Sequence, residues 1–273
     1  MITYSKDQIS QALEALSVSV GDTILVHSSL MHLGSIENVA LNDQAKIFID
    51  TVLSYLGSEG TLAVPAGFWE YGGSGQVAYD TRTSGVARDL GVVPAHFVTR
   101  AATERSLNPH YAVAAIGAEA ATLCGGETAV AFGAGSPWDR LLAQDVKILF
   151  FGVGLEALML ARYAEQTQGV PYLYNKLYDA PIYRQGRIQD LPVVTPVRYL
   201  HLDFTYDLSR LIKTLDDQGA IIRTKLGGSS GMMVRSKPAF SAMLAGFKTD
   251  LHYLLEAPPS YIRGEIPFDI VSL

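Results

Sequence analysis

Four uniformly apolar runs of strand length alternate with segments of helical periodicity, and this alternation is what most constrains the fold. The runs read TILVHSS, GTLAVPA, YAVAAIG and VKILFFGV, over residues 23–29, 60–66, 111–117 and 146–153. Strands that are apolar on both sides need cover on both sides. The pattern predicts an α/β fold, with a central, mostly parallel or mixed sheet covered by helices on both faces.

Caps and apolar periodicity predict the helices between these strands. Ser5 and Gln8 form a capping-box pattern before a helix that runs to about Leu16. Pro137 stands where a first helical turn can begin. Further helices are expected over 43–56, 88–100 and 156–168.

The last third of the chain shows shorter elements. We expect strands at 181–183 and 193–201 joined through Gln185-Gly186, a helix at 206–215, and a hairpin of 220–226 with 232–235. No linker or internal repeat interrupts the sequence. We therefore expect one domain over 1–273, with a core over about 1–176 and a C-terminal α+β elaboration over about 177–273.

Composition narrows the class of protein. Hydrophobic residues make up 48% of the 273 residues and charged residues 18%, a balance typical of a compact globular chain. The formal net charge of −6 is spread along the chain and offers no patch for nucleic acid or an anionic membrane. The expected partner is therefore a small molecule or another protein.

The expected location is the cytoplasm. The single cysteine, Cys124, can form no intrachain disulfide, so folding does not require an oxidising compartment. The first ten residues contain no apolar stretch of the kind found in signal peptides. The longest apolar run, 146–155, contains Lys147 and is too short to span a bilayer. Membrane insertion is therefore not expected.

The first candidate site follows the strand that contains His27. This strand ends in Ser28-Ser29 and turns through Leu30. At the carboxyl end of a sheet strand, hydroxyl and backbone N–H groups can hold a phosphate or an amide. Alternatively, the serines only cap the next turn. His27 is interpreted as a hydrogen-bonded histidine of the core rather than as a catalyst.

Two further motifs read RSLNPHYAVAAIG and FGAGSPWDRL. Arg105 and Ser106 open the first, where an arginine can grip a phosphate or a carboxylate through two N–H groups, or be a solvated charge. Ser136 lies at the expected N-cap of the Pro137 helix. It either caps this helix or lines a helix N-terminus that faces a cofactor.

A loop rich in glycine and aromatic residues, GFWEYGGSG, covers residues 67–75. Phe68, Trp69 and Tyr71 can form a wall for a sugar ring, since aromatic rings stack on pyranose faces. The alternative is a mobile surface loop with incidental aromatic residues. Asp80 follows this loop in the context YDT.

These motifs, together with the stretch KILFFGVGLEALMLARYAEQTQGVPYLYNK, resemble the aminoglycoside 3-N-acetyltransferase family. That family combines V-H-S-S-L, R-S-x-H-P, F-G-x-x-S-P-x-x-R-L and a helical T-x-x-H-x-x-E. The matching stretches keep this order over about 24–176. The resemblance implies an enzyme that transfers an acyl group from acetyl-CoA, or another acyl-CoA, to an amine on a sugar.

The resemblance also implies roles for residues. The cofactor-binding candidates are Ser28, Ser29, Leu30, Arg105, Ser106 and Ser136, and the substrate-binding candidates are Phe68, Trp69, Tyr71 and Asp80. Asp80 stands in a context resembling the family's F-D-P, which implies a carboxylate that faces the substrate or orders the loop.

The helical motif departs from the family at two of its three positions. Met159 stands where the family has threonine, Arg162 stands where it has histidine, and Glu165 is retained. The spacing puts all three on one helix face. In the family the histidine is the general base toward the acceptor amine and the glutamate orients it. Arginine cannot be that base, because it stays protonated and has no acceptor lone pair.

Asn108 also occupies a family histidine position, and His110 follows two residues later. Three interpretations remain open. The enzyme transfers acyl groups by positioning alone, with Arg162 paired to a substrate phosphate or to Glu165. Another group is the base, with His110, Glu165 and Asp80 as the candidates. Or the fold binds cofactor or sugar without catalysis.

We interpret the chain as a CoA-dependent N-acyltransferase of an amino sugar, nucleotide-linked, in surface-polysaccharide biosynthesis. The GVPYLYNK segment and the sequence beyond it resemble a branch associated with such gene clusters. The alternatives are an aminoglycoside antibiotic acetyltransferase and a non-catalytic binding or assembly protein. A polycationic antibiotic requires a strongly acidic cleft, and the loop after Gly67 carries only Glu70. The partners expected are acyl-CoA and the amino-sugar acceptor, and a homodimer is left open.

Other chemistries find no support in the sequence. No G-x-S-x-G elbow occurs, which argues against a serine hydrolase. Gly152 and Gly154 follow a strand, but the third glycine of a dinucleotide fingerprint is missing. The six histidines and one cysteine show no metal-ligand spacing, so no metal is expected.

Overall fold

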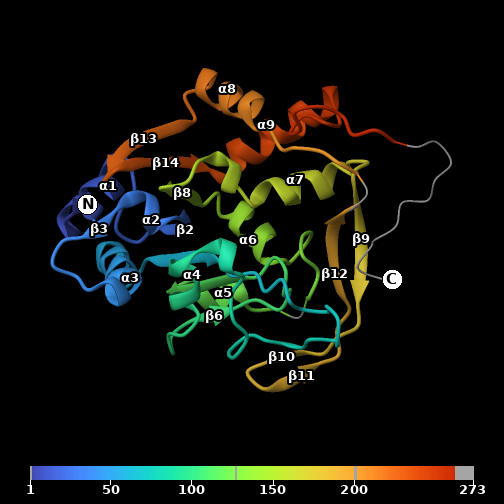
Figure 1. The fold of residues 1–273 in the computed structure, drawn as a ribbon, viewed down its shortest axis with the longest axis horizontal. Coiled ribbons are helices and arrows are strands. Elements are labelled where there is room, and N and C mark those ends of the chain that lie inside the picture. Colours follow the sequence, from blue (N-terminus) through green and yellow to red (C-terminus); the bar gives the residue numbers. More distant parts are fainter. Residues whose placement is uncertain (1, 127, 200–201, 262–273) are drawn as a thin grey trace.

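A seven-stranded sheet forms the centre of the protein (Figure 1). The structure is a computed structural model, and it describes residues 2–126, 128–199 and 202–261. The strand order is β13-β14-β8-β2-β4-β7-β6. In sequence order these strands are β2 (Thr23–Ser28), β4 (Thr61–Pro65), β6 (Glu104–Arg105), β7 (Val113–Gly117), β8 (Lys147–Phe151), β13 (Ile221–Leu226) and β14 (Ser229–Arg235).

The sheet is mixed. Strands β8, β2 and β4 run parallel, whereas β14, β7 and β6 each pair antiparallel with their neighbours. All four apolar runs of the sequence form central strands, each trimmed by one or two residues at its ends. The predicted α/β fold with a central mixed sheet is confirmed.

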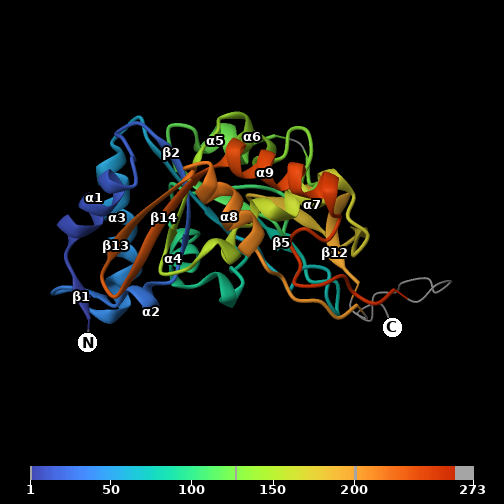
Figure 2. The same cartoon turned by 90° about the horizontal axis from the view of Figure 1, so that it is seen from above.

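Helices cover both faces of this sheet because its strands are apolar on both sides. On β2, Ile24 and Val26 join one hydrophobic cluster and Leu25 joins the other. The first cluster lies under α1 (Lys6–Ala15), α3 (Gln44–Leu56) and α4 (Val92–Phe97). The second lies under α5 (Ala120–Cys124), α6 (Pro137–Ala143), α7 (Leu160–Gln168), α8 (Ser209–Asp217) and α9 (Ser236–Thr249). Figure 2 shows α5, α6 and α9 on the side of the molecule away from α2 (Leu30–Leu33) and α4.

The predicted capping box is confirmed at α1. The Gln8 N–H donates to Ser5 Oγ at 3.1 Å, and the Ser5 N–H donates to Gln8 Oε1 at 2.8 Å. The helix expected over 88–100 is shorter than predicted. A 3-10 turn, η2 (Arg88–Leu90), precedes α4, and Gly91 separates them at φ +87°. This left-handed backbone suits glycine and cannot continue a right-handed helix.

The helix expected over 156–168 is also interrupted. A 3-10 turn, η3 (Leu155–Ala157), comes first, Leu158 is extended at ψ 93°, and α7 follows. The helix predicted from 206 begins three residues late, at Ser209. The reason is that Tyr206 forms a β-bridge with Leu255 instead of a helical turn.

Small sheets complete the last third of the chain. Strand β9 (Leu173–Tyr178) pairs antiparallel with β12 (Val193–Arg198), and β10 (Ile182–Arg184) lies between β5 (Tyr79–Asp80) and β11 (Arg187–Gln189). Gln185-Gly186 was expected to lead from 181–183 to 193–201, but it closes the β10–β11 hairpin. Its positive φ angles, 52° and 78°, make the tight turn that such a hairpin needs. Residues 200–201 of the predicted strand lie outside the described residues.

The remaining short elements are β1 (Thr3–Tyr4), β3 (Ser35–Ile36) and η1 (Leu41–Asp43). The predicted hairpin of β13 and β14 is confirmed, and β14 pairs with β8 of the central sheet. The C-terminal elaboration therefore shares hydrogen bonds with the core. That residues 1–273 form a single domain stays a prediction.

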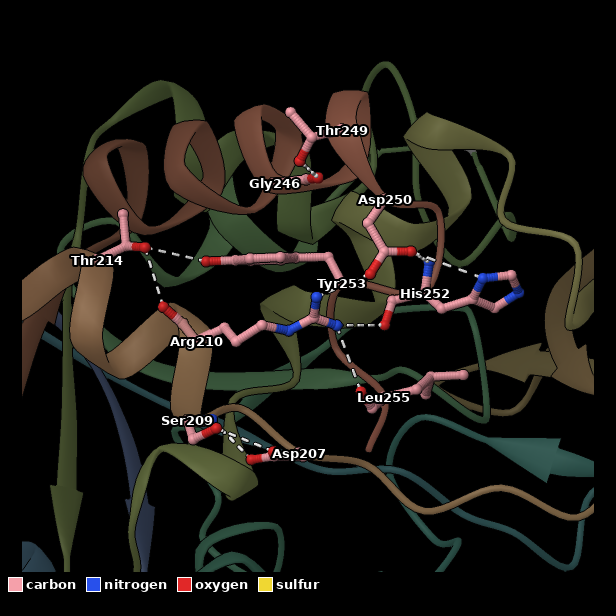
Figure 3. Close-up of polar contacts among 10 residues, drawn as sticks. All are labelled: Asp207, Ser209, Arg210, Thr214, Gly246, Thr249, Asp250, His252, Tyr253 and Leu255. Carbon is pink, nitrogen blue, oxygen red and sulfur yellow. Dashed lines mark hydrogen bonds and ion pairs between the residues drawn. The ribbon is translucent and has the colours of Figure 1, made fainter. Parts of the chain in front are cut away.

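Polar contacts bind the segment after α9 to α8 (Figure 3). Arg210 donates to the Asp250 carboxylate at 2.7 Å and to the His252 carbonyl at 2.8 Å. Since Arg210 and Asp250 are both well exposed, the ion pair itself contributes only about 0–1 kcal/mol. The Arg210 contacts matter for the position of the segment after α9. This segment ends in the β-bridge between Leu255 and Tyr206.

Within the described ranges, no helix combines the length and the apolar character that crossing a bilayer demands.

Phe151 is expected to be among the most sensitive core positions. Its ring is fully buried in β8 and meets Phe48 edge-on, with the ring centroids 5.9 Å apart. Phe151→Ala should lower the free energy of unfolding by ~3–5 kcal/mol, because it removes apolar contacts and leaves a cavity. Urea denaturation measures this. Ile188→Ala, at a position 66% exposed, is the control and should stay within about 0.5 kcal/mol of wild type. Equal losses in the two variants would contradict the assignment of the core.

Candidate functional site

A cavity of about 350 Å³ opens where β2 and β4 end. Parallel strands present their carboxyl ends on one edge of a sheet, and this is where α/β proteins usually bind ligands. The lining includes His27 and Ser28 from β2, Trp69 from the aromatic loop, Asp89 from η2 and Arg162 from α7. Residues from four separate parts of the chain therefore meet here.

Two buried polar atoms at this strand end have no hydrogen-bond partner among the described residues: His27 Nε2 and Ser28 Oγ. His27 was expected to be a hydrogen-bonded core residue. It is buried and stacks on Phe150 with ring centroids 5.1 Å apart, but its Nε2 lacks a partner. Burial lowers the pKa of His27 to about 3, so the ring is neutral at pH 7. Buried polar atoms nearly always have a hydrogen-bond partner. His27 Nε2 and Ser28 Oγ therefore indicate a place for a polar ligand atom or a solvent molecule.

The structure separates the three cofactor-binding candidates after β2. Ser28 lines the first cavity, whereas Leu30 is buried and lines another hollow, of about 800 Å³, between α2 and α4. The Ser29 N–H donates to the Phe151 carbonyl at 2.8 Å, and its hydroxyl makes no capping bond to α2. Roles for Ser29 and Leu30 in cofactor binding stay predictions.

Arg105 is buried and holds backbone carbonyls. It donates to Ser84 O at 2.6 Å and to Gly85 O at 2.8 Å, and its guanidinium lies 4.9 Å from the centre of the Tyr79 ring. Ser106 Oγ accepts from the Val113 N–H at 3.0 Å. In this arrangement both side chains fasten the segment before β7 to its neighbours. Their contact with a cofactor stays a prediction.

Ser136 and Asp80 also organise their own loops. Ser136 is buried at the N-cap of α6 and accepts from the Asp139 N–H at 3.2 Å, as the capping alternative describes. The Asp80 carboxylate accepts from the N–H groups of Arg82 and Gly186, both at 2.7 Å. This geometry matches the loop-ordering interpretation of Asp80, and a role toward the substrate stays a prediction.

A second cavity, of about 610 Å³, adjoins the first. Trp69 and Tyr111 line both cavities and form their common wall. Tyr71 lines the second cavity with a buried ring, and its hydroxyl donates to the Ala180 carbonyl at 2.5 Å. Phe68 instead packs toward the core, with its ring centroid 6.3 Å from that of Tyr79. Of the three predicted aromatic residues, Trp69 and Tyr71 therefore lie together on a cavity wall.

His110 lies in the second cavity and not beside Arg162. Its Nδ1 is 3.2 Å from Thr195 Oγ1, and its ring packs against Tyr178 with centroids 4.6 Å apart. Burial is the main reason that the pKa of His110 is lowered to about 4. The imidazole is therefore neutral at pH 7 and can accept a proton or a hydrogen bond. A catalytic role stays a prediction.

Arg162 pairs with Glu165. The Arg162 Nη1 to Glu165 Oε2 distance is 2.6 Å, and the Glu165 side chain is fully buried. Tyr172 donates to the other carboxylate oxygen at 3.0 Å, and the Arg162 guanidinium lies 3.7 Å from the centre of the Tyr206 ring. Burial alone would lower the pKa of Arg162, but the attraction of Glu165 outweighs it and the pKa is raised. Arg162 is therefore a fixed cation in the wall of the first cavity.

The sequence reasoning missed the tyrosines around this pair. Tyr172 comes seven residues after Glu165, and Tyr206 comes from the segment before α8. No local pattern marks either residue: Tyr172 follows α7 closely in the chain, and Tyr206 reaches α7 only through the packing of the C-terminal elaboration. Within the described part of the chain, no cluster of histidine, cysteine, aspartate or glutamate is arranged to hold a metal ion.

Solved acetyltransferases share this fold. A structure described as AAC-IIIb binary with CoASH aligns with a TM-score of 0.76, covering 90% of this chain and 97% of the other at 20% identity. The aminoglycoside acetyltransferase AAC(3)-IIb aligns with the same TM-score of 0.76, covering 94% and 99% at 22% identity. The helix-covered mixed sheet is thus the fold of an acetyltransferase class.

Sequence comparison identifies the family. The model of the aminoglycoside 3-N-acetyltransferase family matches residues 25–248, so the chain belongs to this family. A relative, aminoglycoside N(3)-acetyltransferase III of Serratia marcescens, is 27% identical over 192 residues, which cover 64% of this chain and 69% of the relative. The Pseudomonas aeruginosa protein of the same name is 22% identical over 252 residues, covering 85% and 89%.

Removing the charge of Glu165 should destabilise the protein. Glu165→Gln leaves the Arg162 guanidinium without its counter-charge and should lower the free energy of unfolding by about 3 kcal/mol, the lower end of the range for a broken buried pair. Tyr172→Phe removes one hydrogen bond to a charged group and should lower it by about 2 kcal/mol. Denaturation at neutral pH measures both. Glu14→Gln, on the exposed side of α1, is the control and should change little. If Glu165→Gln is as stable as wild type, the Arg162–Glu165 ion pair does not stabilise the fold.

The stability of the protein should fall as the pH is lowered from about 6.5 to about 4. His110 in the folded protein has a pKa of about 4, below its ordinary value of 6.5. In that window the unfolded chain binds a proton that the folded chain does not, which favours unfolding. One such proton contributes a slope of about 1.4 kcal/mol per pH unit. Urea unfolding at several pH values should give a smaller slope for His110→Gln than for wild type. Identical slopes would show that His110 is not held neutral.

Proposed function

We propose that this protein is a CoA-dependent N-acetyltransferase that acetylates an amine of an aminoglycoside-type amino sugar. The observation that carries the proposal is the pair of cavities with the common wall of Trp69 and Tyr111. A transferase with two substrates needs two binding regions that meet at the reacting atoms. Family membership supplies the reaction class.

The first cavity fits part of acetyl-CoA. Acetyl-CoA supplies an activated acyl thioester, whose transfer to an amine forms an amide and releases the thiol. The buried Ser28 Oγ and His27 Nε2, which lack partners among the described residues, suit the carbonyl and amide groups of such a molecule. The relative solved with CoASH supports the cosubstrate.

Arg162 directs the proposal toward catalysis by positioning. It stays protonated and occupied by Glu165, so it takes no proton from the acceptor amine. An amine that is partly neutral at pH 7 needs mainly to be held against the acyl carbon. His110, a neutral imidazole in the adjoining cavity, is the remaining candidate for the proton acceptor.

The aminoglycoside acceptor now has better support than the nucleotide-linked amino sugar of surface-polysaccharide synthesis. The relatives reported above are named aminoglycoside N(3)-acetyltransferases. Asp89 and Glu156 of the first cavity are carboxylates that suit the ammonium group of the acceptor at the point where it meets the acyl group. These favour the alternative that the sequence ranked second.

Arg162→His tests the chemistry. The variant restores a base beside Glu165, and we expect kcat near pH 7 to rise roughly 100-fold, the lower end of what general-base catalysis contributes. The wild-type rate should instead follow the neutral fraction of the acceptor amine, without an ionisation in the histidine range. Thiol release with acetyl-CoA and a panel of aminoglycosides measures both. Arg223→His, at an exposed ion pair, is the control and should behave as wild type.

Binding is measured separately from turnover. Acetyl-CoA in large excess should raise the melting temperature by mass action. The absence of any thermal shift or heat at millimolar acetyl-CoA would overturn the cosubstrate. If wild type and Arg162→His both bind acetyl-CoA but neither acetylates any acceptor, the protein is a non-catalytic binding protein.

A further inference from the structure

The attractive contacts of the Arg162 guanidinium lie behind it, in the wall of the first cavity. Arg162 lines this cavity with a side chain that is 27% exposed, whereas its partner Glu165 is fully buried. Arg162 Cζ lies 3.7 Å from the centre of the Tyr206 ring, and Tyr206 is not among the described residues that line the cavity. A cation is attracted to the face of an aromatic ring at this distance. Both attractions therefore draw the guanidinium into the wall.

Two other carboxylates of the first cavity can compete for this cation. Asp89 accepts a hydrogen bond from the Trp69 indole N–H at 2.8 Å, and Glu156 accepts one from the Gly154 N–H at 2.8 Å. Neither carboxylate has an ion-pair partner among the described residues. A guanidinium released from the wall is attracted to such carboxylates and neutralises their charge. The position of Arg162 therefore determines whether the cavity presents free negative charge.

The Tyr206 ring is held by the segment after α9 and by a neighbouring ring. Tyr206 forms a β-bridge with Leu255, and the Asp207 N–H donates to the Leu254 carbonyl at 2.9 Å. The Phe204 ring meets Tyr206 edge-on, with the ring centroids 5.5 Å apart. A surface that is already ordered binds a second group at little entropic cost. The Tyr206 ring is therefore a preorganised surface for the guanidinium.

From these contacts we propose that Tyr206 is a positioning residue for binding of the acceptor. Its ring holds the Arg162 guanidinium against Glu165. The carboxylates of Asp89 and Glu156 then remain available to the acceptor ammonium. The inference rests on the proposed function, because it requires the ammonium to meet the acyl group in the first cavity. Tyr206 acts through Arg162 and takes no part in the chemical step.

Steady-state kinetics of Tyr206→Leu test this role, because leucine keeps apolar volume and removes the aromatic face. KM for the aminoglycoside sisomicin should rise about tenfold, the loss of roughly one charge-assisted contact to the ammonium. The kcat value and KM for acetyl-CoA should stay within about twofold of wild type, since only acceptor binding changes. Tyr206→Phe keeps the aromatic face and should restore KM for sisomicin. Tyr183→Leu, on β10 and outside the described lining of both cavities, is the matched control.

The Arg162→His background separates positioning from a merely structural effect. This variant lacks the guanidinium, so adding Tyr206→Leu should no longer raise KM for sisomicin. If Tyr206→Leu raises KM equally in both backgrounds, or leaves it unchanged in the wild-type background, Tyr206 does not position Arg162. Thermal melting establishes that each variant is folded, and Tyr206→Met replaces Tyr206→Leu if the latter does not fold.

Calorimetric titration of sisomicin keeps the test independent of turnover. If wild type binds sisomicin without acetylating it, the proposed function is wrong, and the dissociation constants of the same variants decide the role of Tyr206. If wild type acetylates sisomicin but Tyr206→Leu binds it equally well, only the role of Tyr206 is refuted. If wild type neither binds nor acetylates any aminoglycoside, both are wrong.

Discussion

The buried carboxylate of Glu165 is the constraint on which the arrangement of the site depends. A carboxylate without solvent needs a cation and hydrogen-bond donors, and Glu165 obtains them from Arg162 on the same helix and from Tyr172 after it. The guanidinium in turn lies on the ring of Tyr206. Helix α7 is thus in contact with the C-terminal elaboration, in which Tyr206 forms a β-bridge with Leu255. In the same segment Arg210 donates to Asp250 and His252 (Figure 3).

This constraint changes the chemistry available to the site. At the position where the resemblance implies a histidine base, the protein carries a permanent cation that is already paired. The neutral imidazoles lie elsewhere: His27 at the end of β2 and His110 across the wall formed by Trp69 and Tyr111. The two adjoining cavities therefore differ in charge, since the first carries the carboxylates of Asp89 and Glu156 and the second carries the cations Lys176 and Arg198.

The sequence predicted the central strands and the capping box well, because both depend on neighbours a few residues away. The prediction of one helix over 88–100 was wrong, because Gly91 interrupts it. Gln185-Gly186 was expected to lead to the strand at 193–201, but it closes the hairpin of β10 and β11. Strand β9 and helix α9 were not predicted. Arg105 shows the same limit in the site, since a loop arginine that suits a phosphate was found buried against backbone carbonyls.

The sequence by itself determined the α/β class and the family, because apolar periodicity and ordered motifs are written along the chain. Only the tertiary structure decided which motif residues share a cavity. Ser28 and Trp69 do, while Leu30 and Ser136 face other surroundings. It also decided that Arg162 is bound by Glu165 and Tyr206. The physical reason is that burial and pairing depend on segments distant in sequence, whose approach is set by the packing of the whole sheet and its helices.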